Sequence, residues 1–545
     1  MGKVLLRLAL CPALLGWGQT DISGERVRAH VKFLASDLLE GRGVGVRGGE
    51  LATEYLAAQL AVAGAKPAGV NGSWFQPVAL VGVHTQPGSQ LKAGAIDFQL
   101  LTDFVGTAPT QIAQEAFEAD AVFVGHGISA PEFGWDDYAD VNVKGKTVVL
   151  FTGEPPSEDP AFFGGRALTY YGRWTYKYEQ ALRQGAVAAI ILHTTPTAGY
   201  GWEVVRNSWG REEFAVKRSG DALAFAGWLS QEAAGRLANA AGGKTVDELL
   251  RLADTRGFRA FAMGVKIGGK IISKVRDIAT RNVAGIVHGS DTAVAAEAVI
   301  YSAHWDHLGI NDRAEGDRIY NGAVDNATGC GMLLEIARAW AEAKVKPRRS
   351  ALFVFMAAEE SGLRGSEYYV RQPLIPLGQT SLVLNFDSYF PFGRVKDVVL
   401  TGAERTTFWA QIQDVARRYE LTISPDPRPE QGSFFRSDHF PFAKAGVPAF
   451  SVNGGSTFVA NAEASATRLK EYGVQSYHQP SDEYRDDWDF SNMEYLARFG
   501  AALGQEAANA DALVRLLPVE TKPVTLAKAK AGKKKAKRAA RGRRK

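Results

Sequence analysis

The amino-acid sequence predicts an α/β protein with a β-rich domain inserted into it. From Asn282 to about Leu517, apolar strand-like runs alternate with helical segments, as they do in α/β sheet proteins. Between Phe117 and Arg276 the chain consists mainly of short β-rich runs. The length of 545 residues, with 46% hydrophobic and 22% charged residues, suits roughly two to four globular domains and excludes a disordered or fibrous protein.

The first twenty residues have the pattern of a short secretory leader. Lys3 and Arg7 precede an apolar run over residues 8–15, and residues 16–18 place two glycines at a possible cleavage position. We therefore expect a signal peptide over residues 1–20 and a secreted or periplasmic protein. A mis-set start codon or an ordinary buried N-terminal segment is the alternative. No later segment offers about 18 consecutive apolar residues, so we expect no transmembrane helix.

Residues 21–116 are expected to form the first segment of the α/β domain. Ser23 can cap a helix. The apolar residues that follow it recur at helical spacing: Val27, Val31, Leu34 and Leu38. The glycine-rich residues 43–48 formally match a dinucleotide fingerprint, but they follow a helix where the fingerprint requires a strand. We expect a turn between two helices there.

Residues 117–276 are expected to form the insert. The predicted strands cover residues 121–124, 146–151 and 186–192. A helical stretch around residues 175–184 ends at Gly185. Residues 143–149 and 184–191 resemble parts of a protease-associated domain, which implies that the insert is a domain of this kind.

Residues 277–517 form the second expected segment of the α/β domain, and three of its apolar runs end in residue types that bind metals. These runs and the residues that follow them are 298–303 before His304, 351–358 before Glu359 and Glu360, and 382–386 before Asp387. The carboxyl ends of strands in an open α/β sheet lie along one edge, where ligands bind. We therefore expect these four side chains to be neighbours.

Two further candidates lie in loops. Asp325, in the turn-rich residues 321–326, precedes an amphipathic helix, so the turn can direct its carboxylate toward the same edge. His478 lies in a proline-containing loop. Of the nine histidines, we expect only His304 and His478 to be ligands, and His307 to support the site from behind.

The order of these motifs resembles that of the M28 family of co-catalytic zinc exopeptidases. His-x-Asp, Asp-Asn, Glu-Glu, a strand-ending Asp and Tyr-His-x-Pro-x-Asp follow one another between His304 and Asp482, and the resemblance covers roughly residues 22–110 and 282–515. The resemblance implies a three-layer α/β/α zinc-peptidase sandwich that binds two zinc ions and in which Glu359 is the catalytic base. It also implies the metal ligands: His304, Asp325, Glu360, Asp387 and His478, with Asp325 bridging the ions.

The charge and chemistry of this ligand set are consistent with two zinc ions. Two such ions carry +4 and the three carboxylates −3, so one hydroxide would make the cluster neutral. A mixed imidazole and carboxylate set suits zinc better than magnesium. Adjacent Glu359 and Glu360 cannot both point the same way, so one can bind metal while the other accepts a proton. Asp306 is placed to orient His304 through its second ring nitrogen.

The stretch Ser437-Asp438-His439 cannot be a catalytic triad, because contiguous residues cannot form a linear hydrogen-bonded relay. It resembles a Ser-Asp-His stretch that lies near the substrate pocket of M28 peptidases. Some members have a tyrosine three positions before this serine that helps to stabilise the oxyanion, whereas here the residue is Phe434. Arg436 or a zinc ion alone is the alternative donor. The expected substrate-binding residues are Phe434, Arg436, Asp438 and Tyr477.

We therefore predict a two-zinc aminopeptidase that acts on peptides. The alternatives are a carboxypeptidase or dipeptidase on the same fold, a glutaminyl cyclase with one zinc ion, and a non-catalytic binding protein. A carboxypeptidase usually binds the terminal carboxylate with a basic fork, for which Arg364, Arg436 and Lys444 are scattered candidates. The sequence has no His-Glu-x-x-His or Gly-x-Ser-x-Gly motif, which disfavours other hydrolase classes.

The net charge of +4 conceals a basic C-terminus. Twelve lysines and arginines lie within residues 522–545, and the remaining chain carries 51 basic against 59 acidic residues. We expect a disordered basic tail over residues 518–545. A solvated charged terminus is commoner than a nucleic-acid-binding one, so no nucleic-acid partner is expected.

Overall fold

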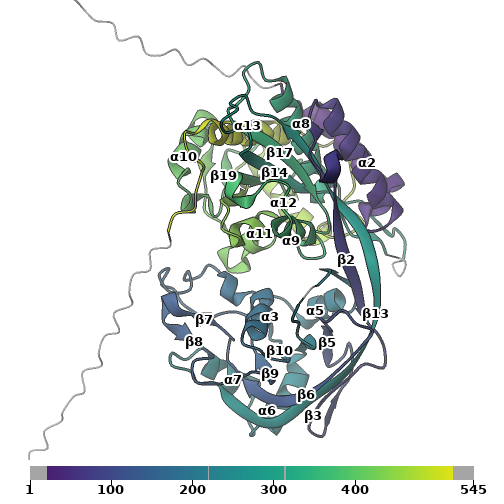
Figure 1. Ribbon diagram of the computed structural model, residues 1–545, viewed down its shortest axis with the longest axis vertical. Coiled ribbons are helices and arrows are strands. Elements are labelled where there is room, and N and C mark those ends of the chain that lie inside the picture. The colour runs from purple at the N-terminus through teal and green to yellow at the C-terminus, as the bar shows by residue number, and fades with distance from the viewer. Residues whose placement is uncertain (1–20, 219, 312–314, 519–545) are drawn as a thin grey trace, which may run out of the picture.

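The computed structural model describes residues 21–218, 220–311 and 315–518, which form two lobes (Figure 1). The expected leader over residues 1–20 lies outside the described residues, as does the expected tail beyond Pro518. Within the described part of the chain, no helix is long and apolar enough to cross a membrane.

The first lobe is built on a mixed sheet. Its strands follow one another in the order β21 (Ala449–Ser451), β18 (Thr380–Asn385), β14 (Ala298–His304), β17 (Ser350–Met356) and the C-terminal part of β13 (Phe261–Val287). The first four are parallel, whereas β13 is antiparallel to β17. Every residue of β14, β17 and β18 is buried, as expected for parallel strands covered on both faces.

Helices cover both faces of this sheet. One face packs against α1 (Gly24–Leu34), α2 (Arg47–Val62), α8 (Thr328–Glu342), α10 (Trp409–Arg418) and α13 (Ser491–Asn509). The other face packs against α9 (Arg364–Arg371) and α11 (His439–Lys444). Alternate residues of β14 divide between the layers, since Tyr301 lies in the first core and Ile300 in the second. The expected three-layer α/β/α fold is confirmed.

The second lobe contains a sheet of its own. Its strands are β5 (Phe104–Thr107), β12 (Phe225–Leu229), β10 (Ala188–Leu192), β9 (Thr147–Leu150), β6 (Gln114–Phe123) and the N-terminal part of β13, with β3 (Gln90–Ala93) and β4 (Ile96–Phe98) beside it. Helices α6 (Gln231–Ala240) and α7 (Val246–Ala253) pack on one face, and α3 (Trp174–Arg183) and α5 (Trp202–Trp209) on the other. The insert is thus an α/β structure with helices on both faces of its sheet, and is not mainly β as expected. Strand β10 is apolar on both faces, so both faces must pack against helices.

The insert begins earlier in the chain than residue 117. β3 and β5 hydrogen-bond to β13 and β12, which places residues 90–116 in the second sheet. The 27-residue β13 runs through both lobes, and β2 (Phe75–Thr85) pairs with it over the register Phe75↔Val283 to Thr85↔Ser273 (Figure 1). Because β2 and β13 connect the two lobes as continuous strands, the change in sequence pattern at residue 117 does not mark the start of the insert.

The first helix is shorter than expected. α1 ends at Leu34, and the side chain of Leu38 is 73% exposed in the turn that follows. The side chain of Ser23 makes no capping hydrogen bond, whereas its backbone N–H donates to Glu335 on α8 at 2.9 Å. The glycine-rich residues 43–46 form the expected turn between helical segments.

Candidate metal centre

Four of the expected site residues lie at one edge of the first sheet. His304 ends β14, Glu359 and Glu360 follow β17, and Asp387 follows β18. Since β14, β17 and β18 are parallel, their carboxyl ends meet at that edge. The four side chains that were expected to be neighbours at the ends of these strands therefore lie at the same sheet edge.

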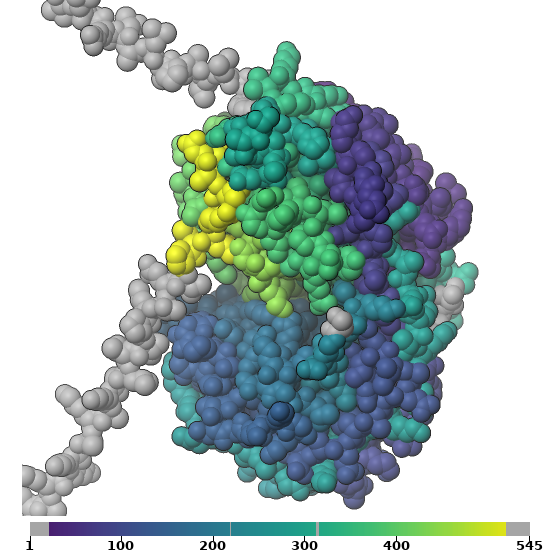
Figure 2. Space-filling view, in the orientation of Figure 1, coloured from purple at the N-terminus to yellow at the C-terminus, as the bar shows by residue number. Residues whose placement is uncertain are grey.

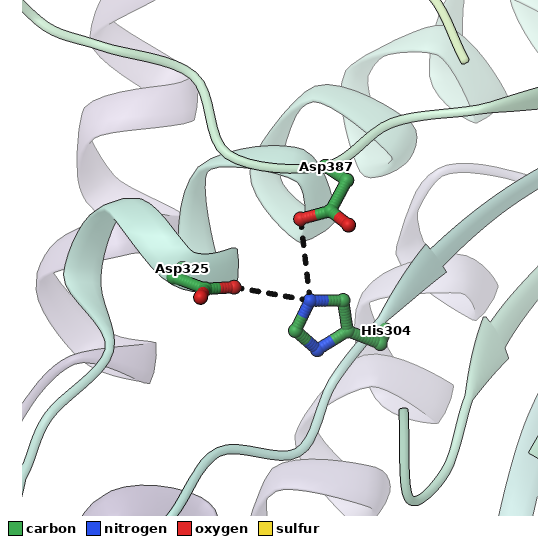
Figure 3. Close-up of side chains that lie close together, drawn as sticks. All are labelled: His304, Asp325 and Asp387. Carbon is green, nitrogen blue, oxygen red and sulfur yellow. Dashed lines mark hydrogen bonds and ion pairs between the residues drawn. The ribbon is translucent and has the colours of Figure 1, made fainter. Parts of the chain in front are cut away.

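Asp325 lies between two histidines. The Nε2 atom of His304 is 3.1 Å from Asp325 Oδ1 and 3.3 Å from Asp387 Oδ1 (Figure 3). The Nε2 atom of His478 is 3.2 Å from the other oxygen, Asp325 Oδ2, and 3.1 Å from Glu360 Oε2. The five expected ligands thus form two sets of three that share one carboxylate.

The loops that carry Asp325 and His478 are tied together by a carboxylate. Asp325 lies in a short turn, Ala323–Ala327, just before α8, and His478 lies in the loop after α12 (Ala462–Gln475). Asp482, which is 1% exposed, accepts hydrogen bonds from the backbone N–H groups of Val324 at 3.0 Å and Asp325 at 3.1 Å. The Tyr-His-x-Pro-x-Asp motif therefore supplies both a candidate ligand and the support of another.

The supporting role of Asp306 differs from the expected one. The second ring nitrogen of His304, Nδ1, lies 3.1 Å from the backbone carbonyl oxygen of Asp306 but 4.0 Å from its carboxylate. The carboxylate instead accepts the backbone N–H of Glu359 at 3.1 Å. Asp306 thus fixes His304 through its main chain and the Glu359 turn through its side chain.

Two more contacts fix the candidate ligands. The Oγ atoms of Ser437 and Ser388 donate to the two oxygens of Asp387 at 2.5 and 3.0 Å. His307 contacts a candidate ligand, with its Nδ1 atom 2.7 Å from Glu360 Oε1. His307, Asp325 and Glu360 also offer ligand atoms within 4.8 Å of one another.

The adjacent glutamates differ in their electrostatic environments. Burial raises the pKa of Glu359 well above its usual value; His304 opposes this effect, and Asp387 and Glu360 add to it. Burial would also raise the pKa of Glu360, but His478 and His307 lower it to about 2. A pair of carboxyl groups whose pKa values are pushed apart in this way can take different roles.

The donor set fits zinc ions. Within the described part of the chain, no lysine or arginine forms an ion pair with Asp325, Glu360 or Asp387. Metal ions bound here would offset the repulsion among these clustered carboxylates. Imidazole nitrogen combined with carboxylate oxygen is the chemistry that zinc accepts.

The four expected substrate-binding residues differ in their contacts and in their exposure to solvent. The ring of Tyr477 stacks on that of His478 with centroids 4.0 Å apart. Phe434 packs edge-on against His439, and Arg436 is exposed. Asp438 is fully buried and accepts a hydrogen bond from Ser366 of α9 at 2.5 Å.

One supporting residue had no signal in the sequence. Arg42, 1% exposed, donates to the backbone carbonyls of Trp305 at 2.9 Å, Asn321 at 2.5 Å and Gly322 at 2.9 Å. It thereby buttresses the loops that follow His304 and precede Asp325. Arg42 also donates to the carbonyl of Leu34 at 2.6 Å. A buried arginine bound to four carbonyls cannot be told from a surface arginine by spacing or composition.

The family model of peptidase family M28 matches residues 282–500, which contain all five candidate ligands. The chain contains a peptidase family M28 domain. A stretch of 147 residues is 29% identical to leupeptin-inactivating enzyme 1 of Streptomyces exfoliatus, covering 26% of this chain and 31% of that enzyme. The matched stretch thus spans less than a third of that relative's length.

Similar folds occur among solved structures, of which the first described here has a TM-score above 0.5. The aminopeptidase from Aneurinibacillus sp. strain AM-1 is similar over 93% of this chain and 98% of that chain, with a TM-score of 0.51 and 18% identity. The zinc aminopeptidase BSAP from Bacillus subtilis is similar over 89% of this chain and 95% of that chain, with a TM-score of 0.44 and 15% identity. The first likeness extends over both lobes. The M28 match excludes the insert, so the insert's resemblance to a protease-associated domain stays a prediction.

Proposed function

We propose that the chain is a two-zinc exopeptidase that removes residues from the N-termini of peptides. The observation that carries this proposal is the position of Asp325, whose two oxygens lie 3.1 and 3.2 Å from the Nε2 atoms of two histidines in separate ligand sets. One carboxylate shared in this way can bridge two ions. His304 and Asp387 would hold one ion, and Glu360 and His478 the other.

The zinc ions would supply Lewis-acid polarisation of the scissile carbonyl group. Glu359 is the proposed base, since its carboxylate is not tied to a histidine as that of Glu360 is. Nearby cations favour its ionised form, in which its oxygen can take a proton from the attacking water and pass it to the leaving amine. Asp306, by accepting the N–H of Glu359 at 3.1 Å, holds this base in place.

Tyr477 is the proposed donor to the developing oxyanion. Phe434 lacks a hydroxyl group, whereas the hydroxyl of Tyr477 lies on the ring that stacks against His478. Burial and the nearby carboxylates of Asp325 and Glu360 raise the pKa of Tyr477, so the hydroxyl stays protonated near neutral pH. A protonated hydroxyl can donate a hydrogen bond as negative charge develops.

The direction of cleavage follows from which end of the peptide the site can accept. The buried carboxylates around the two ligand sets suit a substrate amine, and the Aneurinibacillus protein of the same fold is an aminopeptidase by its description. Two of the three scattered basic candidates are engaged elsewhere: Arg364 pairs with Glu367 at 3.1 Å and Lys444 with Glu179 at 2.6 Å. The leader expected over residues 1–20 makes export the corresponding proposal for localisation.

The test is a release assay on a six-residue peptide in free, N-acetylated and C-amidated forms, with zinc measured on the same sample. We expect two zinc equivalents, cleavage of the free and amidated forms, and none of the acetylated form. Cleavage of the acetylated but not the amidated form would identify a carboxypeptidase. One zinc ion with cyclisation of an N-terminal glutamine would identify a glutaminyl cyclase. Two zinc ions without turnover of any peptide would leave a binding protein.

A further inference from the structure

The insert touches the first lobe beside the candidate metal centre. The backbone N–H of Leu168 donates to the carbonyl of Pro429 at 3.0 Å. The ring of Tyr170 lies 4.9 Å from that of Phe440, centroid to centroid, and Lys444 pairs with Glu179 at 2.6 Å. Figure 1 shows α3 and α11 facing each other where these contacts occur, and Figure 2 shows the surface hollowed along the line between the lobes.

Two arginines lie in the segments that form this contact, where the ring of Tyr170 is 5.9 Å from that of Phe435, centroid to centroid. Arg173, half-buried, immediately precedes α3, and Arg436, exposed, lies shortly before α11. Among the described residues, neither side chain makes a hydrogen bond or an ion pair. Burial and the neighbouring Arg436 lower the pKa of Arg173 to about 10, and Tyr200 and Tyr170, which are neutral near pH 7, are the groups that oppose this. Like-charged guanidinium groups repel each other, so an anion bound between these two segments would stabilise both arginines.

The pair is close to the proposed reaction centre. Ser437, the residue after Arg436, donates to Asp387 at 2.5 Å, and Asp387 is a candidate ligand. Consecutive Cα atoms are about 3.8 Å apart, so Arg436 begins one residue from the metal centre. An extended peptide of two or three residues spans roughly 7–11 Å. A short peptide with its N-terminus at the metals therefore brings its C-terminus into the range of these arginines.

We propose that Arg173 and Arg436 together bind the terminal carboxylate of short peptide substrates, with one arginine supplied by each lobe. This proposal rests on the proposed exopeptidase function and adds a preference for di- and tripeptides over longer chains. Arginine suits the role because its planar fork binds carboxylates through paired hydrogen bonds. In longer peptides the terminal carboxylate extends beyond the pair, so amidation should matter only for short substrates.

The experiment compares three short substrates with the same first residue, chosen from a panel of amino-acid p-nitroanilides. They are a dipeptide ending in alanine, its C-terminal amide, and an amide with glutamate at the second position. For the parent protein we expect kcat/KM for the free acid to exceed that for its amide about tenfold, chiefly through KM. The variants Arg173→Gln and Arg436→Gln should each reduce this ratio to near one. Arg183→Gln, at the far end of α3, removes the same charge and should keep the ratio.

Each outcome decides the proposal. A parent ratio near one, or a ratio that both variants retain, would overturn the subsite while p-nitroanilide cleavage still supports the exopeptidase function. The glutamate amide carries a side-chain carboxylate but no terminal one. If kcat/KM for the glutamate amide exceeds that for the alanine amide by as much as the free acid does, the arginine pair would instead bind acidic side chains. If no p-nitroanilide or peptide is cleaved by the zinc-loaded parent, the proposed function fails, and the subsite with it. Arg173→Lys and Arg436→Lys keep the charge, so partial recovery of the ratio would exclude misfolding as the cause.

Discussion

The substitution Glu359→Gln is the most direct test of the proposed division of labour between the two glutamates. Glutamine keeps the size and shape of the side chain but cannot accept a proton from water. Among the described residues the side chain of Glu359 makes no hydrogen bond, whereas its backbone N–H donates to Asp306 at 3.1 Å and its backbone carbonyl accepts from Gly362 and Leu363. We therefore expect an intact fold, two zinc equivalents, and a loss of kcat on the order of a hundred- to ten-thousand-fold, the usual effect of losing a general base.

Glu360→Gln should behave differently. Its carboxylate contacts His307 at 2.7 Å and His478 at 3.1 Å, and these histidines lower its pKa to about 2. Replacing the charged oxygen by a neutral amide removes one of three ligands from the second set. We expect the zinc content to fall from two equivalents toward one, and activity to fall with it.

The assay measures kcat on the best peptide substrate and zinc by elemental analysis on the same preparation. Glu342→Gln is the matched control, because Glu342 is an exposed glutamate on α8 that pairs with Arg338 and is remote from the site in its contacts. It should keep both zinc and activity. If Glu359→Gln stays within about threefold of the parent while Glu360→Gln is inactive with both ions bound, the roles of the two residues are reversed.

Three further predictions follow from single contacts or charges. Asp325→Ala should lose both zinc ions, since its oxygens lie 3.1 and 3.2 Å from the two histidines; retention of either ion at parent level would contradict the bridging role. Burial acts to raise the pKa of Glu335, but Arg26 and Arg338 hold it below its usual value. Its stabilising effect is therefore present above about pH 4.5 and is lost as the pH falls through the lowered value, so Glu335→Gln should destabilise by about 2 kcal/mol at pH 7 and less at pH 3, measured by thermal unfolding. Truncation after Pro518 should leave peptidase activity and the unfolding midpoint unchanged, and a lower midpoint would show that the basic tail contributes to stability.

The arrangement of the candidate ligands could be predicted because it follows from chain geometry. Buried parallel strands are mostly apolar, so the histidine and carboxylate residues that end or follow β14, β17 and β18 mark the sheet edge in the sequence itself. Asp325 and His478 could be predicted as ligands only from the order of motifs, because no geometric rule says where a side chain in a turn or a loop will lie. The resemblance to M28 peptidases therefore carried that part of the prediction.

Other features depend on contacts between segments that are distant in sequence. The start of the insert at β3 is fixed by its pairing with β13, about 175 residues later, and pairing of this kind leaves no periodic signal. The hydrogen bond that Asp438 accepts from Ser366 of α9 joins residues 72 positions apart, so spacing along the sequence could not predict it. The orientation of His304 by a backbone carbonyl could not be predicted either, because every residue has a carbonyl group.

The contacts of residues 429–444 show why the insert belongs to the site and not merely to its surroundings. Pro429 accepts a backbone hydrogen bond from Leu168 of the insert, and eight residues later Ser437 donates to the candidate ligand Asp387 at 2.5 Å. The same short segment is therefore fixed at one end by the insert and at the other by the metal centre. Because β13 and β2 connect the lobes on another side, the insert is attached at two separate places. The fold therefore fixes the position of the insert relative to the candidate ligands. A residue of the insert can contribute to substrate binding only if its position is fixed in this way.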